Sequence, residues 1–407
     1  MPIVYMFVRV VIWLSAFFLS ISLFAQQPLK GRVVDEQTSE PLPFVTIFVN
    51  NTTFGTVTNE KGEFTLNLTS GRHEIVVSYV GYEPIVFQVD SSQLHRTFLF
   101  KLTLKEFVLN EIEVRSQRDS LWYVNLEVFK ENFIGRSAVA RGCKLLNPEV
   151  LIITFDPQSV LLEVKARDVL QIENPTLGYK IKYVLVEFKY YTQESYVVYV
   201  GYPNYEAMSG NSSRQRRWKK KRLEAYNGSP MHFIRTLREQ KLEQEGFNLR
   251  RLHRKPNPNR PSEEELEQAR AQLRQRGPQV VLKESDPISI TLSKASLPKT
   301  IEWLDTARVS YQSYLQRQGK EVALGFEGYF QVVYTGEKEE IAYVQSTSGF
   351  QPRRPTFQTS VISMKEKSVF LEEMGNISDP LGILFEGYWG WEKIGDLLPL
   401  DYQVIRP

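Results

Sequence analysis

The sequence predicts a mostly β protein, in which an N-terminal antiparallel β-sandwich precedes a larger β-rich α+β domain. Two observations support this fold class. Aromatic residues make up 12% of the 407 residues, and such residues favour strands and partly buried sheet faces. Apolar and polar residues also alternate in many short segments, as they do along strands that bury one face.

The sandwich is predicted to cover residues 28–105, where short alternating segments are separated by turn residues about every ten positions. Phe64, Leu66 and Leu68, for example, lie on one face of a predicted strand. Gly62 stands in the turn before that strand, where we expect a positive φ that glycine adopts at little cost.

Residues 1–25 have the pattern of a secretory signal peptide. Arg9 precedes an apolar run over residues 10–24, and the small residue Ala25 stands at the expected cleavage point. The run is shorter than the roughly 20 residues that a membrane-spanning helix needs. We therefore expect export, with the protein in the periplasm or associated with the outer membrane. An uncleaved membrane anchor is the alternative.

The predicted sandwich carries four motifs, at residues 31–35, 41–47, 55–64 and 79–82. Together they resemble the carboxypeptidase regulatory-like domain, a transthyretin-like β-sandwich found at the N-terminus of Bacteroidetes outer-membrane proteins, including TonB-dependent receptors. The resemblance implies a binding or spacer domain without catalytic residues. Residues 109–114 also resemble the short strand that precedes the plug of those receptors. The residues after 114 do not resemble a plug, so we do not expect a transporter.

Residues 106–145 are predicted to form a linker with helical character, and residues 146–407 the β-rich α+β domain. Helix-like spacing of apolar residues predicts a helical insertion over residues 214–276. Near its end, Ser262 and Glu265 have the spacing of a capping box. The helix that they start is polar nearly all round, so we expect it on the surface or in an arm.

Further motifs lie at residues 143–148, 173–179, 216–218, 225–233, 245–247, 387–390 and 397–402. They resemble an uncharacterised Bacteroidetes family in which such a sandwich is joined to a region of unknown function. The resemblance spans most of residues 130–402 and implies kinship without any known activity.

No motif indicates catalytic, cofactor or metal chemistry, so we predict no catalytic residue, no cofactor and no metal ligand. Cys143 is the single cysteine, and we expect a buried structural thiol rather than a nucleophile. The four histidines are scattered, and no two lie four residues apart as in a zinc peptidase helix. His232 is expected to be structural. The aromatic cluster at residues 387–391 is expected to pack in a corner of the last domain rather than stack on sugar rings.

A basic run is the most distinctive polar feature of the sequence. It is expected to be either the solvated start of a helix, balanced by nearby glutamates, or a surface that contacts an anionic component of the envelope. A tryptophan within the run favours a contact surface. Export and a net charge of only +3 argue against nucleic acid. The candidate contact residues are Arg214, Arg216, Arg217, Trp218, Lys219, Lys220, Lys221 and Arg222.

The sequence therefore predicts a non-catalytic, exported envelope protein that binds or scaffolds a protein, lipopolysaccharide or glycan, with room for a peripheral membrane contact. One alternative is an envelope glycan or peptide hydrolase with its site in the C-terminal β-rich domain, which a pocket lined by carboxylates of raised pKa would indicate. A second alternative is a small outer-membrane barrel built from the strands after Val150, which the insertion at 214–276 would interrupt.

Overall fold

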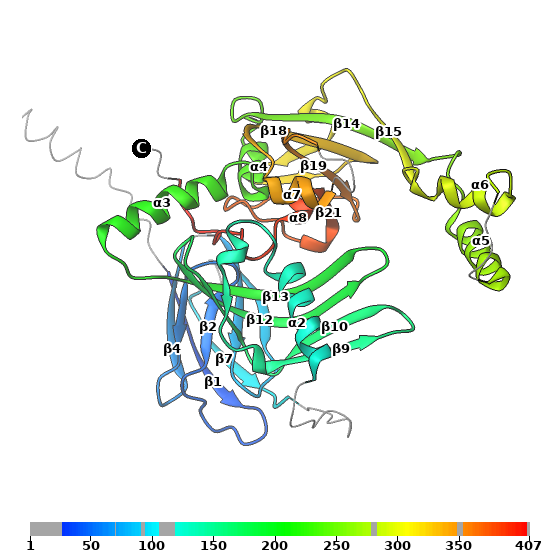
Figure 1. Ribbon diagram of the computed structural model, residues 1–407. Helices are drawn as coiled ribbons and strands as arrows, with labels where there is room; N and C mark the ends of the chain where they lie inside the picture. Colours follow the sequence, from blue (N-terminus) through cyan, green and yellow to red (C-terminus); the bar gives the residue numbers. More distant parts are fainter. Residues whose placement is uncertain are drawn as a thin grey trace, which may run out of the picture. The chain divides into compact units, whose positions relative to one another are not determined.

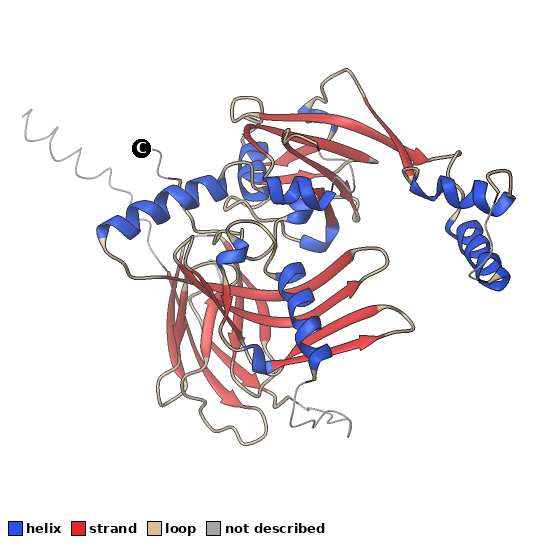
Figure 2. Cartoon of the chain, viewed as in Figure 1, coloured by secondary structure: helices blue, strands red, loops and turns tan. Residues whose placement is uncertain are grey.

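The computed structural model describes residues 27–69, 71–90, 94–105, 119–277, 283–347 and 353–404 (Figure 1). The predicted signal peptide and residues 106–118 of the predicted linker lie outside these ranges. Strands dominate, and most of them pair antiparallel, which confirms the predicted fold class (Figure 2). The chain divides into two compact units: residues 1–224 with 393–407, and residues 225–392.

The N-terminal sandwich of the first unit consists of two sheets. The first has the order β4-β1-β7, with β1 at Gln27–Asp35, β4 at Glu63–Leu68 and β7 at Thr97–Leu102. The second has the order β3-β2-β5-β6, with β2 at Thr46–Val49, β3 at Gly55–Val57, β5 at Arg72–Ser78 and β6 at Ile85–Asp90. All pairs are antiparallel except β1 with β7, which run parallel.

The core of the sandwich follows the alternation of the sequence. Phe64, Leu66 and Leu68 are buried while the residues between them are exposed. They pack with inward residues of the facing sheet, such as Ile75. Gly62 has a φ of 74°, as the turn before β4 was expected to require.

Asp35 fixes the end of β1 to the corner beyond β5. Its carboxylate accepts hydrogen bonds from the backbone N–H groups of Gln37 and Thr38, at 2.9 and 2.8 Å. The hydroxyl of Tyr82 donates to the same carboxylate at 2.9 Å. The Thr38 N–H, followed by the Tyr82 hydroxyl, lowers the pKa of Asp35 because both bonds favour the charged form.

A third sheet of the first unit is antiparallel and has the order β8-β11-β12-β10-β9, with β13 beside β12. Its strands are β8 at Lys144–Leu145, β9 at Leu151–Asp156, β10 at Leu161–Ala166, β11 at Leu170–Asn174, β12 at Tyr179–Tyr191 and β13 at Tyr196–Ala207. One face is covered by helix α2, at Ser120–Phe133, which lies within the predicted linker. The Phe133 ring packs edge-on against the Tyr183 ring, with 4.9 Å between the two ring centres.

The other face of this sheet packs on the sandwich. Phe48 and Val76, which point outward from the second sheet, form a small buried cluster with Val184 of β12. Residues from the C-terminal end of the chain join the same unit, where the Leu400 N–H donates to the Asn51 carbonyl at 2.7 Å. In the first unit, the third sheet therefore packs between the sandwich and helix α2.

The second unit contains a five-stranded sheet of order β15-β14-β18-β19-β21. These strands are β14 at Phe247–Pro256, β15 at Thr300–Leu304, β18 at Tyr329–Lys338, β19 at Phe357–Met364 and β21 at Ile383–Gly387. A small sheet joins β16 at Leu315–Gln318, β17 at Glu321–Leu324 and β20 at Val369–Phe370. The helices α4 at Pro230–Arg238, α7 at Ile341–Thr347 and α8 at Tyr388–Trp391 complete its body.

Aromatic residues form the centre of the second unit. Trp389 is buried against Phe233, and its indole N–H donates to the Gly228 carbonyl at 2.7 Å. This confirms the expectation that the C-terminal aromatic cluster packs rather than forms an open platform. His232 is also buried, and its Nδ1 accepts from the Gly228 N–H at 3.2 Å, which is consistent with a structural role.

Two expected boundaries differ from the structure. The expected domain at 146–407 is divided between the two units, because its first strands pack on the sandwich while residues 225–392 enclose their own core. The expected helical insertion at 214–276 is interrupted by β14. That segment pairs with β18 because Phe247 and Leu249 fill the core of the second unit.

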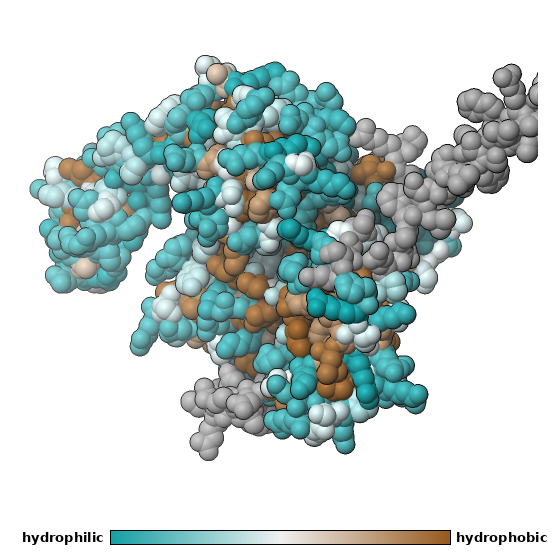
Figure 3. Space-filling model, turned by 180° about the vertical axis from the view of Figure 1, so that it is seen from behind, coloured by the Kyte–Doolittle hydropathy of each residue, from teal (hydrophilic) through white to brown (hydrophobic). Residues whose placement is uncertain are grey.

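Helix α5, at Glu263–Arg276, begins with the predicted capping box. The Ser262 Oγ accepts from the Glu265 N–H at 3.2 Å, and Glu265 Oε2 accepts from the Ser262 N–H at 2.8 Å. With α6, at Pro287–Ser293, it forms an arm carried between β14 and β15 (Figures 1 and 2). The surface of the arm is mostly hydrophilic (Figure 3). Within the described ranges, no helix has the length and apolar character needed to cross a membrane.

The Tyr82→Phe variant loses the hydrogen bond from the Tyr82 hydroxyl to the Asp35 carboxylate. We therefore expect its unfolding temperature at pH 7 to lie about 2–4 °C below that of the wild type. Asp35 stabilises the fold above the ordinary carboxyl pKa of about 4, and that contribution is lost as the pH falls through the lower folded-state value. The difference in unfolding temperature between the wild type and the Tyr82→Phe variant should therefore become smaller at acidic pH. Thermal unfolding across pH measures it, with Tyr79→Phe as the control, and an equal effect of both variants would contradict the assignment.

The Trp389→Phe variant should be less stable than the wild type, because it leaves the Gly228 carbonyl without its hydrogen-bond donor. We expect the free energy of unfolding of the second unit to fall by about 1–3 kcal/mol. Urea unfolding followed by circular dichroism measures this change. The matched control is Trp303→Phe, at a side chain that is 47% exposed, and its effect should stay within roughly 0.5 kcal/mol.

Candidate functional site

The basic run forms most of helix α3, at Ser212–Tyr226. Asn211 precedes the helix, and its side-chain oxygen accepts from the Arg214 N–H at 3.0 Å, as an N-cap residue does. Side chains four residues apart lie on the same side of a helix. Trp218 and Arg222 have this spacing, and both turn away from solvent.

The inner side of α3 is anchored on the turn between β11 and β12. Trp218 is only 3% exposed, and its indole N–H donates to the Pro175 carbonyl at 2.9 Å. Arg222 donates from Nε to the Leu177 carbonyl at 2.7 Å and from Nη2 to the Gly178 carbonyl at 2.9 Å. Its guanidinium also lies 3.9 Å from the centre of the Tyr179 ring. The anchor therefore fixes which side of the helix meets solvent.

The solvent side of α3 carries the other cations. Arg216 and Lys220 lie one turn apart, on the side opposite Trp218, and Arg217 and Lys219 flank them. Lys220 lies 4.0 Å from Glu224 and Lys221 lies 2.6 Å from it. In the part of the chain that the structure describes, no carboxylate pairs with four exposed cations of the run, Arg214, Arg216, Arg217 and Lys219.

The structure thus corrects two members of the predicted contact set. Trp218 is buried and Arg222 is engaged with backbone carbonyls, so neither belongs to the exposed surface. Their i, i+4 spacing was visible in the sequence. The direction in which they point depends on the turn at Gly178, where a Cβ would overlap the indole ring.

The lone thiol is not poised for nucleophilic chemistry. Cys143 is partly buried, and its Sγ lies 3.7 Å from the Val139 carbonyl oxygen. Burial, followed by the charge of Asp396, raises the pKa of the thiol to about 12. The thiolate, which is the nucleophilic form, is therefore scarce at neutral pH. Among the described residues, no group of three or more His, Cys, Asp or Glu side chains could hold a metal ion.

Glu339 is a buried carboxylate of the second unit. Its burial acts to raise its pKa, but hydrogen bonds from Arg353 and from the Thr356 N–H outweigh this effect and lower it. Arg353 Nη2 lies 2.9 Å from Glu339 Oε1 and the Thr356 N–H 2.9 Å from Oε2. Glu339 is thus held ionised, whereas a general acid needs a raised pKa. The hydrolase alternative stays a prediction.

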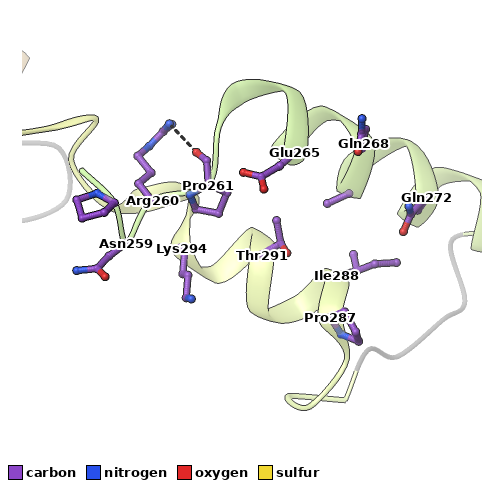
Figure 4. Close-up of a pocket in the computed structure, with 12 residues that line it drawn as sticks. Asn259, Arg260, Pro261, Glu265, Gln268, Gln272, Pro287, Ile288, Thr291 and Lys294 are labelled. Atoms are coloured by element: carbon purple, nitrogen blue, oxygen red, sulfur yellow. Dashed lines mark hydrogen bonds between the residues drawn. The ribbon is translucent and has the colours of Figure 1, made fainter. Parts of the chain in front are cut away.

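A cleft in the arm was missed by sequence reasoning. It lies between α5, α6 and the turn before α5, and it has a volume of about 390 Å³ (Figure 4). Polar side chains from α5 and Thr291 from α6 line it, together with Arg260 of the turn. No local signal could have revealed it, because the cleft exists only where two helices separated in sequence lie side by side.

Comparison with known proteins finds relatives for the N-terminal region. Residues 29–114 match the family described as CarboxypepD_reg-like domain. The TonB-dependent receptor SusC of Bacteroides thetaiotaomicron is 39% identical to this chain over 80 residues, which are 20% of this chain and 8% of the receptor. The chain therefore spans a small part of the length of this curated relative.

Two solved structures show a weak likeness. A 9R-lipoxygenase from Cyanothece PCC8801 is 9% identical, with a TM-score of 0.17, and the match covers 52% of this chain and 48% of that one. A putative membrane-associated protein of unknown function from Bacteroides fragilis is also 9% identical, with a TM-score of 0.16 and coverage of 89% and 93%. The family match is the informative one: residues 29–114 of this chain are similar in sequence to the CarboxypepD_reg-like domain family.

Proposed function

We propose that this protein is a non-catalytic, exported component of the cell envelope that binds phosphate-bearing lipid through the solvent side of α3. One observation carries the proposal: four exposed cations in two helical turns have no carboxylate partner among the described residues. The signal-like pattern at residues 1–25 and the receptor-like N-terminal domain support a place in the periplasm or at the outer membrane.

The chemistry of α3 favours a phosphate-rich surface. At physiological ionic strength charges act together over about 8 Å, so cations within two turns of a helix reinforce one another. Each Lys or Arg near an anionic membrane surface contributes about 1 kcal/mol to binding. Three of the four unpaired cations are arginines, whose planar group matches phosphate oxygens. No large apolar residue of α3 is exposed, which favours contact with headgroups over insertion.

The anchor of α3 adds to this function. A cationic segment that is unfolded before binding must be ordered when it binds, and this ordering reduces its affinity. The contacts of Trp218 and Arg222 already hold the helix in place. The solvent-facing cations therefore present a preformed surface.

The R214Q/R216Q/R217Q/K219Q variant tests the proposal. Removing four charges at about 1 kcal/mol each should weaken binding to phosphatidylglycerol vesicles by on the order of 100-fold or more. Binding of the wild type should also fall as salt rises. Co-sedimentation measures both effects, with a second series of vesicles that contain lipopolysaccharide to distinguish the two lipid sources.

The matched control for this experiment is R250Q/K320Q/K365Q/K367Q, which removes the same number of exposed charges outside α3. It should bind like the wild type. If both variants lose vesicle binding equally, binding depends on the net charge of the protein and not on α3. If the wild type binds neither kind of vesicle, the proposal is wrong.

A second prediction concerns the anchor. The Arg222→Leu variant leaves the Leu177 carbonyl without its donor and leaves the Gly178 carbonyl with the Met208 N–H alone, so we expect α3 to detach more often. Hydrogen exchange followed by mass spectrometry should show faster exchange over residues 212–226 and 174–179. Arg217→Leu, on the solvent side, should leave both segments unchanged. Slow exchange in both variants would mean that α3 does not depend on this anchor.

A further inference from the structure

We infer that residues 393–402, near the carboxyl end of the chain, act as a strap that holds α3 in place. While the strap is docked on the first unit, α3 is ordered and its cations form one surface. When the strap leaves, α3 loosens and that surface is lost. The inference rests on the proposed function for its lipid part alone, because the order of α3 can be measured without lipid.

The strap is a buried part of the first unit. The chain enters the second unit at residue 225 and returns to the first at residue 393. Figure 1 shows this end of the chain in red. The apolar side chains of Ile394, Leu398 and Leu400 are buried. The strap therefore belongs to the core of the first unit and is not a free tail.

The start of the strap packs against the end of α2. The Gly395 N–H donates to the Ile134 carbonyl at 2.9 Å, and the Ser137 hydroxyl donates to the Asp396 carboxylate. Gly395 has no room for a side chain, because a Cβ there would lie 2.7 Å from the Ile134 carbonyl oxygen. This close fit fixes the position of Gly395 and of its carbonyl group.

The far end of the strap is tied to the loop between β2 and β3 of the sandwich. The Leu400 N–H donates to the Asn51 carbonyl at 2.7 Å. The Thr53 N–H donates to Asp401 Oδ1 at 2.9 Å, and the Thr53 hydroxyl donates to the other oxygen of the same carboxylate. The strap is thus held at both ends by contacts that do not involve α3.

Asn174, at the end of β11, joins the strap to the turn that carries α3. Its buried side chain donates from Nδ2 to the Gly395 carbonyl at 2.8 Å and accepts at Oδ1 from the Leu177 N–H at 3.0 Å. The Leu177 carbonyl in turn accepts from Arg222 of α3. An amide donates on one side and accepts on the other, which a carboxylate cannot do. Strap and helix are therefore connected through two residues of the turn.

A second link between the strap and α3 runs through Tyr179. Burial, opposed by the nearby charge of Arg222, raises the pKa of Tyr179 to about 12, and the charge of Asp401 adds to the rise. The Tyr179 ring also stacks on Arg222, with 3.9 Å between the guanidinium carbon and the ring centre. Both links from the strap therefore lead to residues that hold Arg222.

These contacts make the order of α3 depend on a distant part of the chain. The carbonyls that anchor α3 belong to the turn at 174–178, and turns are generally less stable than the strands that they connect. Without the strap, the buried amide of Asn174 loses its acceptor, and the turn loses a contact that orders it. The anchor of α3 then weakens with the turn.

The order of the sequence gives this dependence a consequence. Residues 212–226 are synthesised before the second unit, and the strap is synthesised after it. Domains fold as their residues become available during synthesis. The cationic surface of α3 is therefore displayed only once the residues of the second unit have been made.

Hydrogen exchange of the N174D variant, followed by mass spectrometry, tests the role of the strap. The new carboxylate keeps an acceptor for the Leu177 N–H but has no donor for the Gly395 carbonyl. We expect exchange over residues 393–402 and 212–226 to become roughly tenfold faster. Residues 247–256, in the second unit, should exchange as in the wild type.

Two further variants bracket this result. G395A forces a Cβ against the Ile134 carbonyl, so it should loosen both the strap and α3 from the strap side. The matched control is Q403A, at an exposed residue just beyond the strap, which should leave the exchange of both segments unchanged.

Phosphatidylglycerol vesicles test the connection with lipid binding. Coupling between two sites is reciprocal, so lipid that binds α3 should also hold the strap in place. Adding vesicles to N174D should slow exchange over residues 393–402 by about threefold or more. The same variant combined with R214Q/R216Q/R217Q/K219Q should show no slowing.

The outcomes separate the two proposals. Faster exchange in the strap of N174D without a change over α3 would overturn the inference, and so would an equal effect of Q403A. Vesicles that bind α3 of N174D but leave the exchange of the strap unchanged would contradict the coupling. If the wild type binds no vesicles while N174D still loosens α3, the strap keeps its role and the lipid-binding proposal is wrong.

Discussion

The orientation of α3 depends on one close approach between backbone and side chain. At Gly178, in the turn between β11 and β12, the indole of Trp218 occupies the space that a Cβ would need. The φ of this glycine is 70°, a conformation that other residues adopt at a cost. Because the turn has no side chain here, Trp218 and Arg222 reach its carbonyls, and the remaining cations are directed to solvent.

Local sequence patterns predicted the strands of this protein better than their partners. Alternation identified β4 and β5 directly, but it could not show that β1 runs parallel to β7, since alternation is the same in both directions. β14 was missed because its apolar residues, Phe247, Leu249 and Leu252, stand among arginines and follow a helical segment. Its pairing with β18 and the core of the second unit make it a strand.

The same limit applies to the two candidate sites. The composition of the basic run was evident from the sequence, and so was the i, i+4 spacing of its two anchoring residues. Which side they face depends on a turn some 40 residues earlier, as the Trp218–Pro175 hydrogen bond shows. The cleft of the arm left no trace in the sequence, because Arg260 and Thr291 line it together only after both helices have packed. The charge of the basic run could thus be predicted from the sequence. The direction in which its side chains point, and the cleft of the arm, could not.

The most direct test of the central claim is to locate α3 when the protein binds lipid. A spin label at Ser213→Cys would report from the exposed side of the helix, while Cys143 reacts slowly because burial raises the pKa of its thiol to about 12. Collisional accessibility to a water-soluble relaxing agent is then measured with anionic and with neutral vesicles. The account predicts that accessibility falls with anionic vesicles alone. A label that remains fully accessible on vesicle-bound protein would contradict it.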